Sequence, residues 1–122
     1  MNANFKVERQ SLEDGVEAVS VFGELDQATV PELRNALDEA FGAGDRSLFI
    51  DLAQCDFIDS TGLSLVVETQ RRLAERERRF ALCCPRPEVT RLLELTGIDE
   101  AVGLCGTRDE AIALLSGARA RD

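Results

Sequence analysis

A chain of 122 residues, with 44% hydrophobic residues and no tryptophan or tyrosine, has the length of one domain with an aliphatic core. Its net charge of -9 argues against nucleic acid as a partner, because phosphate binding requires a basic face. The same charge opposes attraction to an anionic membrane, so a basic protein surface is the better match.

The predicted location is the cytoplasm. No apolar run in the sequence reaches the length of a transmembrane helix. Residues 1–5 lack the basic segment followed by an apolar one that begins a signal peptide. We therefore expect neither secretion nor membrane association.

The four cysteines are predicted to be small core residues in a reducing compartment. Their spacing matches no metal-ligand pattern and the chain has no histidine, so we expect no metal and no cofactor. Redox sensing by an exposed Cys55 is the alternative. The adjacent Cys83 and Cys84 are expected to point to opposite faces of an extended strand. The fourth cysteine is Cys105.

The first half of the chain predicts a β-hairpin, a helix and a buried strand. Alternating residues over 5–9 and 16–22, joined by an Asp-Gly turn, predict two antiparallel strands. Thr29 and Glu32 have the spacing of a capping box at the start of a helix. The nearly continuous apolar run 47–52 predicts a strand that is covered on both faces.

The second half continues the alternation of helices and strands. A helix is predicted from Leu63, with Val66, Val67, Leu73 and Ala74 on its buried side. The elements expected after it are a strand at 80–84, a short helix stopped by Gly97, a strand at 101–104, a helix opened by a capping box of Thr107 and Glu110, and a frayed tail at 117–122.

The predicted fold class is therefore α/β, because alternating strands and helices imply parallel strands joined by right-handed crossovers. The sheet is expected to be mixed but mostly parallel, with four to five strands and about four helices. The sequence shows no repeat or linker, so a single domain over 1–122, with an ordered core of about 5–116, is predicted.

Residues 55–63 place two hydroxyl side chains, Ser60 and Thr61, where a strand-to-helix loop meets the next helix. Binding and catalytic residues often lie on such loops. A catalytic serine needs a base, most often histidine, and the lone lysine, Lys6, lies on the first strand. Ser60 is outside any Gly-x-Ser-x-Gly elbow, and the chain has no phosphate-binding glycine loop. We therefore expect no enzymatic activity.

Three aspartates near this stretch, Asp51, Asp56 and Asp59, suggest the magnesium-dependent phospho-acceptor site of receiver domains. Such a site also needs an acidic pair on an earlier strand and a lysine on a later one, and neither is visible. We favour Asp59 as the cap of the following helix, with the other two solvated or hydrogen-bonded locally.

Ser60 is also a candidate for phosphorylation, which would add about -1.5 to -2 charges at neutral pH. The start of a helix tolerates such a charge within the chain. A partner packed over the loop would have to desolvate the phosphate beside Asp56 and Asp59. From the residues alone, a phosphorylation switch and a pair of simple helix caps both stay open.

The chain resembles the STAS domain family, and within it the bacterial anti-sigma factor antagonists, over about residues 5–115. The most specific part is 57–63, Phe-Ile-Asp-Ser-Thr-Gly-Leu, which is similar to the family's phosphorylation loop. Residues 23–26 resemble its loop before the first helix, and 89–97 resemble its third helix. Three motifs in the right order carry the resemblance.

The resemblance implies partner switching in a bacterial phosphoprotein. An unphosphorylated antagonist binds an anti-sigma factor that is also a serine kinase with an ATP site, and this frees a sigma factor for transcription. The kinase then phosphorylates the antagonist, which dissociates from it. A metal-dependent serine phosphatase later removes the phosphate. The antagonist itself is no enzyme, holds no cofactor, and is expected to be a monomer or weak dimer.

By position, the resemblance implies that Ser60 is the phosphate acceptor, with Thr61 as the second choice. The residues expected to bind the partner are Glu24, Asp26, Asp56, Asp59, Ser60, Thr61 and Gly62. Two alternatives are a phosphorylated STAS scaffold subunit of a larger signalling complex and a ligand-binding STAS module of a transport system.

Overall fold

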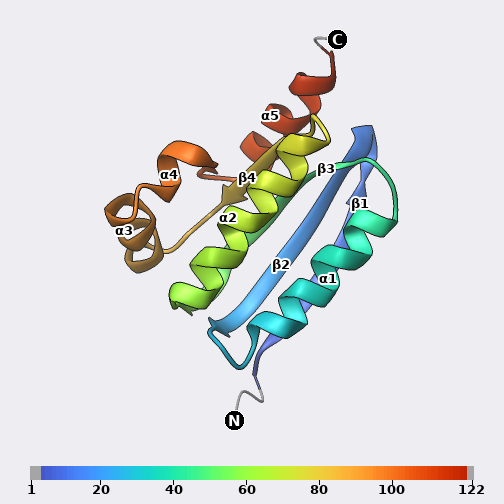
Figure 1. Ribbon diagram of the computed structural model, residues 1–122. Helices are drawn as coiled ribbons and strands as arrows, with labels where there is room; N and C mark the ends of the chain where they lie inside the picture. Colours follow the sequence, from blue (N-terminus) through green and yellow to red (C-terminus); the bar gives the residue numbers. More distant parts are fainter. Residues whose placement is uncertain (1–3, 121–122) are drawn as a thin grey trace.

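Five strands form one sheet in the order β1-β2-β3-β4-β5, as the computed structural model shows (Figure 1). The structure describes residues 4–120, and side chains as far as residue 116. The strands are β1 (Lys6–Leu12), β2 (Val16–Leu25), β3 (Ser47–Ile58), β4 (Phe80–Cys83) and β5 (Gly103–Cys105). The α-helices are α1 (Val30–Gly42), α2 (Ser60–Glu75), α3 (Pro87–Leu95), α4 (Ile98–Ala101) and α5 (Arg108–Ala120).

The predicted fold class is confirmed. Strand β1 pairs antiparallel with β2, and every later pair in the sheet is parallel. A short 3-10 helix, η1 (Glu13–Gly15), joins β1 to β2, and Asp14 and Gly15 take left-handed backbone angles there. This is the conformation for which an Asp-Gly pair is suited.

Helices cover both faces of the sheet. Leu48, Ile50 and Leu52 of β3 lie in the larger core cluster, which includes the buried faces of α1 and α2. Phe49, between them in the chain, lies in a second cluster with Leu115 of α5. Because β3 is covered on both sides, successive residues are apolar, as the run 47–52 predicted.

Three strands run further than predicted, and the first of them, β1, continues to Leu12 instead of ending at residue 9. Strand β3 runs to Ile58 instead of ending at Leu52, and β2 runs to Leu25, because the two remain paired as far as Leu25 and Ile58. Cys55 therefore lies within β3 and is fully buried, which confirms it as a core residue. The alternative of redox sensing by an exposed Cys55 is wrong. Glu24, expected on a loop, lies within β2.

Of the two predicted capping boxes, one is wrong and one is confirmed in part. The capping box of Thr29 and Glu32 is wrong, because the Thr29 side chain makes no capping bond and turns back to the preceding loop. The box at the start of α5 is confirmed in part. The Glu110 amide donates to Thr107 Oγ1, but the Glu110 carboxylate accepts from Gly106 rather than from Thr107.

Further details of the later elements differ from the predictions, and α2 begins at Ser60 rather than at Leu63. Helix α2 buries Leu65 and Thr69, whereas Ala74 is exposed. Gly97 stops α3 in a left-handed conformation, as predicted, but a further helix, α4, follows it. The last strand begins at Gly103 rather than at residue 101. The predicted frayed tail is helical as far as Ala120, and its side chains and residues 121–122 lie outside the described part.

Among the described residues, no helix is long and apolar enough to cross a bilayer.

Candidate functional site

Asp59 is the residue on which the site is built. It follows β3 directly and is the N-cap of α2, where its Oδ1 accepts from the amides of Thr61 and Gly62 at 2.9 and 3.0 Å. The Asp59 carbonyl accepts from the Leu63 amide at 3.0 Å. Three amide donors of the first helical turn are thus bonded to one residue, which confirms Asp59 as a helix cap.

The same aspartate joins the two loops at this edge of the sheet. Asp59 Oδ2 accepts from the Gln27 amide at 3.1 Å, and the Asp59 amide donates to the Leu25 carbonyl at 3.0 Å. In the loop before α1, Asp26 Oδ1 accepts from the amides of Ala28 and Thr29. The carboxylates of Asp26 and Asp59 therefore fix the loop conformation as well as supplying charge.

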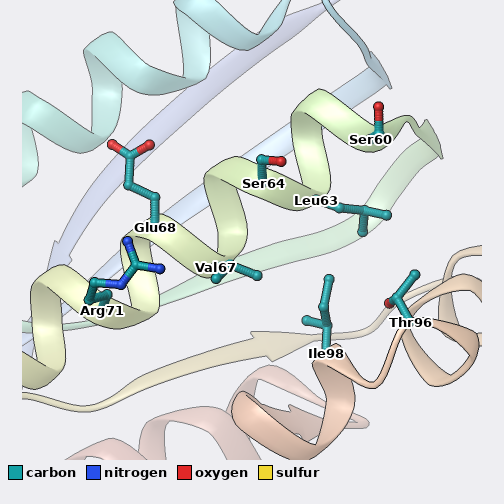
Figure 2. A pocket seen from close by; sticks show the side chains of 8 residues that line it. All are labelled: Ser60, Leu63, Ser64, Val67, Glu68, Arg71, Thr96 and Ile98. Carbon is teal, nitrogen blue, oxygen red and sulfur yellow. The ribbon is translucent and has the colours of Figure 1, made fainter.

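The two adjacent hydroxyls differ sharply. Thr61 is half-buried, and its Oγ1 donates to Asp59 Oδ1 at 2.5 Å. Ser60 is exposed, and within the described part of the chain its hydroxyl has no hydrogen-bond partner. Figure 2 shows the Ser60 side chain pointing away from the helix into open space. Of these two adjacent hydroxyls, Ser60 is therefore the one that is exposed and free of an internal hydrogen bond.

Gly62 allows the start of α2 to lie directly against the sheet. A Cβ at this position would lie 2.8 Å from Cγ2 of Ile58 and 3.0 Å from Cγ of Leu25. Both contacts are closer than side chains normally approach. The glycine is buried, so its role in the site is to seat the helix rather than to touch a partner.

The charge of Asp59 is stabilised by these bonds. The Thr61 hydroxyl, followed by the amides of Gly62 and Gln27, holds the pKa of the Asp59 carboxyl below its ordinary value of 3.8. At neutral pH, Asp59 is therefore ionised beside Ser60.

A groove of about 700 Å³ runs from Ser60 along α2. In Figure 2, Leu63 and Val67 of α2 lie opposite Thr96, which follows α3, and Ile98, the first residue of α4. The remaining lining residues are Ser64, Glu68 and Arg71, with Arg71 at the far end from Ser60. The sequence did not predict this groove, because the segment opposite α2 lies more than 30 residues away from Ser60 in the chain.

The other predicted partner-binding residues lie on the strands that lead to the two loops and do not form one cluster with Ser60. Glu24 is exposed on β2. Asp56 is exposed on β3 and forms an ion pair with Arg86 at 3.1 Å. Phe57, in the same strand, exposes 48% of its surface and was not singled out from the sequence as a contact residue. This exposed phenylalanine, in the strand that leads to Ser60, gives the acidic surface an apolar contact point.

The three aspartates of the receiver-like hypothesis do not share a site. Asp51 pairs with Arg108 of α5 at 3.5 Å, Asp56 pairs with Arg86, and Asp59 caps α2. Each carboxylate thus has its own partners, and the favoured role of Asp59 as the helix cap is confirmed.

Comparison with known proteins decides the family. The family model described as the STAS domain matches residues 11–111. The chain belongs to the STAS domain family. A curated relative, the anti-sigma-B factor antagonist of Staphylococcus aureus (strain NCTC 8325 / PS 47), is 34% identical over 100 residues, which cover 82% of this chain and 90% of the relative.

Solved STAS structures share the fold over nearly the whole chain. The crystal structure of an anti-sigma factor antagonist from Mycobacterium paratuberculosis has a TM-score of 0.83 and 30% sequence identity, covering 97% of this chain and 95% of the other. The anti-sigma factor antagonist SpoIIAA in its unphosphorylated form has a TM-score of 0.79 and 25% identity, covering 92% and 97% of the two chains.

Proposed function

We propose that this STAS chain is an anti-sigma factor antagonist whose binding to its partner is switched off by phosphorylation of Ser60. The observation that carries the proposal is the exposed, unbonded hydroxyl of Ser60 at the start of α2. The relatives named as anti-sigma factor antagonists, one of them described in its unphosphorylated form, support the assignment.

In this proposal, the unphosphorylated chain binds a cytoplasmic anti-sigma factor that is also a serine kinase, and a sigma factor is released. The kinase transfers the γ-phosphoryl group of ATP to Ser60 Oγ, the hydroxyl proton leaves, and ADP is formed. A serine phosphatase later hydrolyses the phosphate with water. The chain acts as a substrate and binding partner and not as an enzyme, because Ser60 has no basic side chain bonded to it.

The local geometry explains why a phosphate on Ser60 would repel a partner. The amides of Thr61, Gly62 and Leu63, which would otherwise bind an anion at a helix start, are already bonded to Asp59. A phosphate at Ser60 therefore extends toward solvent beside an ionised carboxylate. The added charge of about -1.5 to -2 falls where a partner must pack, and its desolvation opposes binding.

The proposal is tested by replacing Ser60 and measuring capture of an anti-sigma factor kinase from the same organism. Ser60→Ala is expected to retain the kinase, and Ser60→Asp is expected to lose it. Gln10→Asp is the charge control, since it adds the same charge on the exposed strand β1, away from α2. Equal capture by Ser60→Ala and Ser60→Asp would contradict the switch.

A ligand-binding STAS module is the second candidate, and the groove beside Ser60 is the observation that favours it. Its apolar walls and hydroxyl groups suit a small amphipathic molecule. Mass spectrometry of the protein under native and denaturing conditions separates the candidates. A stoichiometric small molecule that is released on denaturation would support the ligand-binding module.

A further inference from the structure

Several cysteines lie on the opposite side of the sheet from α1 and α2. Three neighbouring strands place potential metal ligands in one row: Asp51 of β3 pairs in register with Cys83 of β4, and Cys83 pairs with Cys105 of β5. Cys83 and Cys105 belong to the core cluster beneath α5. The row lies at the carboxyl ends of β4 and β5, the edge where parallel sheets commonly bind ligands.

Cys84 joins this row because the backbone turns sharply after β4. Its φ angle is 62°, a left-handed conformation that is uncommon for a residue other than glycine. The Cys84 amide donates to the Cys105 carbonyl at 2.9 Å and holds the turn. The expectation that Cys83 and Cys84 point to opposite faces is wrong, because Cys84 is not in extended conformation and the two sulfur atoms lie close together.

We propose that Asp51, Cys83 and Cys84 form a binding site for one thiophilic divalent metal ion, with zinc as the commonest candidate. One carboxylate oxygen of Asp51 and the two Sγ atoms lie within 4.8 Å of one another. Thiolate sulfurs on a tetrahedral zinc ion are about 3.8 Å apart, so the ligand atoms have to approach one another by about 1 Å at most. Two thiolates and a carboxylate are a soft donor set that favours zinc over magnesium or calcium.

The surroundings complete the site. Asp51 Oδ1 accepts from the Ala53 amide at 2.9 Å, which fixes the carboxylate. Arg108 lies 3.5 Å from Asp51 Oδ2. Three negative ligands are balanced by a divalent ion together with the Arg108 guanidinium, so the occupied site is neutral. The metal has to displace the two thiol protons, which is the ordinary cost of binding zinc to cysteines.

A cavity of about 390 Å³ gives access to the site. Cys84, Cys105 and Pro85 are among the residues that line it, and Cys84 is half-buried where Cys83 is fully buried. A metal ion with its water ligands can therefore reach the Cys84 sulfur first. The expected fourth ligand is a water molecule from this cavity.

The test is a zinc titration of the purified, reduced and metal-stripped chain against a chromophoric zinc chelator. One equivalent of zinc is expected to bind, and cobalt substitution is expected to give thiolate-to-cobalt charge-transfer absorption with tetrahedral d–d bands. Cys84→Ser and Cys83→Ala are each expected to weaken zinc binding by at least about tenfold.

Cys55→Ser is the matched control, because it removes a buried thiol from the other face of the sheet. It is expected to bind zinc as the unaltered chain does. The proposal is overturned if the chelator keeps all the zinc, if the cobalt complex shows no thiolate band, or if Cys84→Ser binds zinc with unchanged affinity. Circular dichroism of each variant checks that it is folded. The cobalt spectrum of the unaltered chain tests thiolate ligation without any substitution.

Discussion

The Thr61 hydroxyl donates a 2.5 Å hydrogen bond to Asp59 Oδ1, so only one of two adjacent hydroxyls is left for chemistry. Ser60, the first residue of α2, has no such bond within the described chain. The loop sequence alone left both residues open as phosphate acceptors. The bond from Thr61 to the helix cap favours Ser60, because transfer to Thr61 would first have to break it.

Phosphate transfer is therefore predicted to occur on Ser60 alone. Incubation with the partner kinase and ATP, followed by peptide mass spectrometry, should locate one phosphate on Ser60. Thr61→Ala is expected to be phosphorylated, and Ser60→Ala is expected to stay unmodified. Phosphate on Thr61 in the unaltered chain would show that the bond to Asp59 does not protect this hydroxyl.

The ionised Asp59 is predicted to stabilise the fold in a pH-dependent way. Its pKa is lowered in the folded chain, so the unfolded chain takes up a proton first as the pH falls. The stabilisation is complete above the ordinary pKa of 3.8 and is lost as the pH falls through the lower folded value. Asp59→Asn keeps a good capping side chain but does not titrate, so its denaturant-unfolding free energy should depend less on pH in this range.

Removing the cap altogether should cost stability at neutral pH. Asp59→Ala is expected to lower the free energy of unfolding by about 1 to 2 kcal/mol, a typical loss for an N-cap. A matched substitution, Asp56→Ala, removes an exposed carboxylate from β3, the strand that precedes Asp59. It should change the free energy of unfolding by under about 1 kcal/mol. Equal losses for the two variants in urea unfolding would contradict the role given to Asp59.

Gly62→Ala is predicted to displace the start of α2. The added methyl group would lie 2.8 Å from Ile58 and 3.0 Å from Leu25, both of which are buried. We expect a loss of about 1 to 3 kcal/mol in the free energy of unfolding, as for other overpacked cores. Chemical shifts of Ser60 and Gln27 should move as well. Gly42→Ala is the control, because the space around its Cβ is empty.

The groove beside Ser60 is predicted to be part of the partner interface. Ser64 is exposed and lines this groove one turn after Ser60, so Ser64→Arg should block docking without disturbing the core. We expect its affinity for the anti-sigma factor kinase to fall at least about tenfold, or 1.4 kcal/mol. Gln10→Arg adds the same charge on exposed β1 and should bind normally. Equal affinities would place the interface elsewhere.

The sequence predicted the elements that depend on local patterns. The alternation of strands and helices, the Asp-Gly turn and the capping role of Asp59 follow from residues close together in the chain. It failed where long-range pairing decides the structure. Strand β3 continues past Leu52 only because β2 pairs with it, and this pairing buries Cys55.

The proposed metal site could not be predicted from the sequence for the same reason. Asp51, Cys83 and Cys84 match no metal-ligand spacing, since strand register and one left-handed residue bring them together. The groove at Ser60 likewise depends on how Ile98 is placed against α2. Such relationships are properties of the fold and are not present in the order of residues along the chain.

The central claim is that phosphate on Ser60 prevents partner binding, and isothermal titration calorimetry tests it most directly. The chain would be titrated into the proposed anti-sigma factor kinase before and after stoichiometric phosphorylation of Ser60, with ADP present. We predict that phosphorylation weakens binding at least about a hundredfold, or roughly 2.7 kcal/mol. The same Kd for both forms would contradict the account.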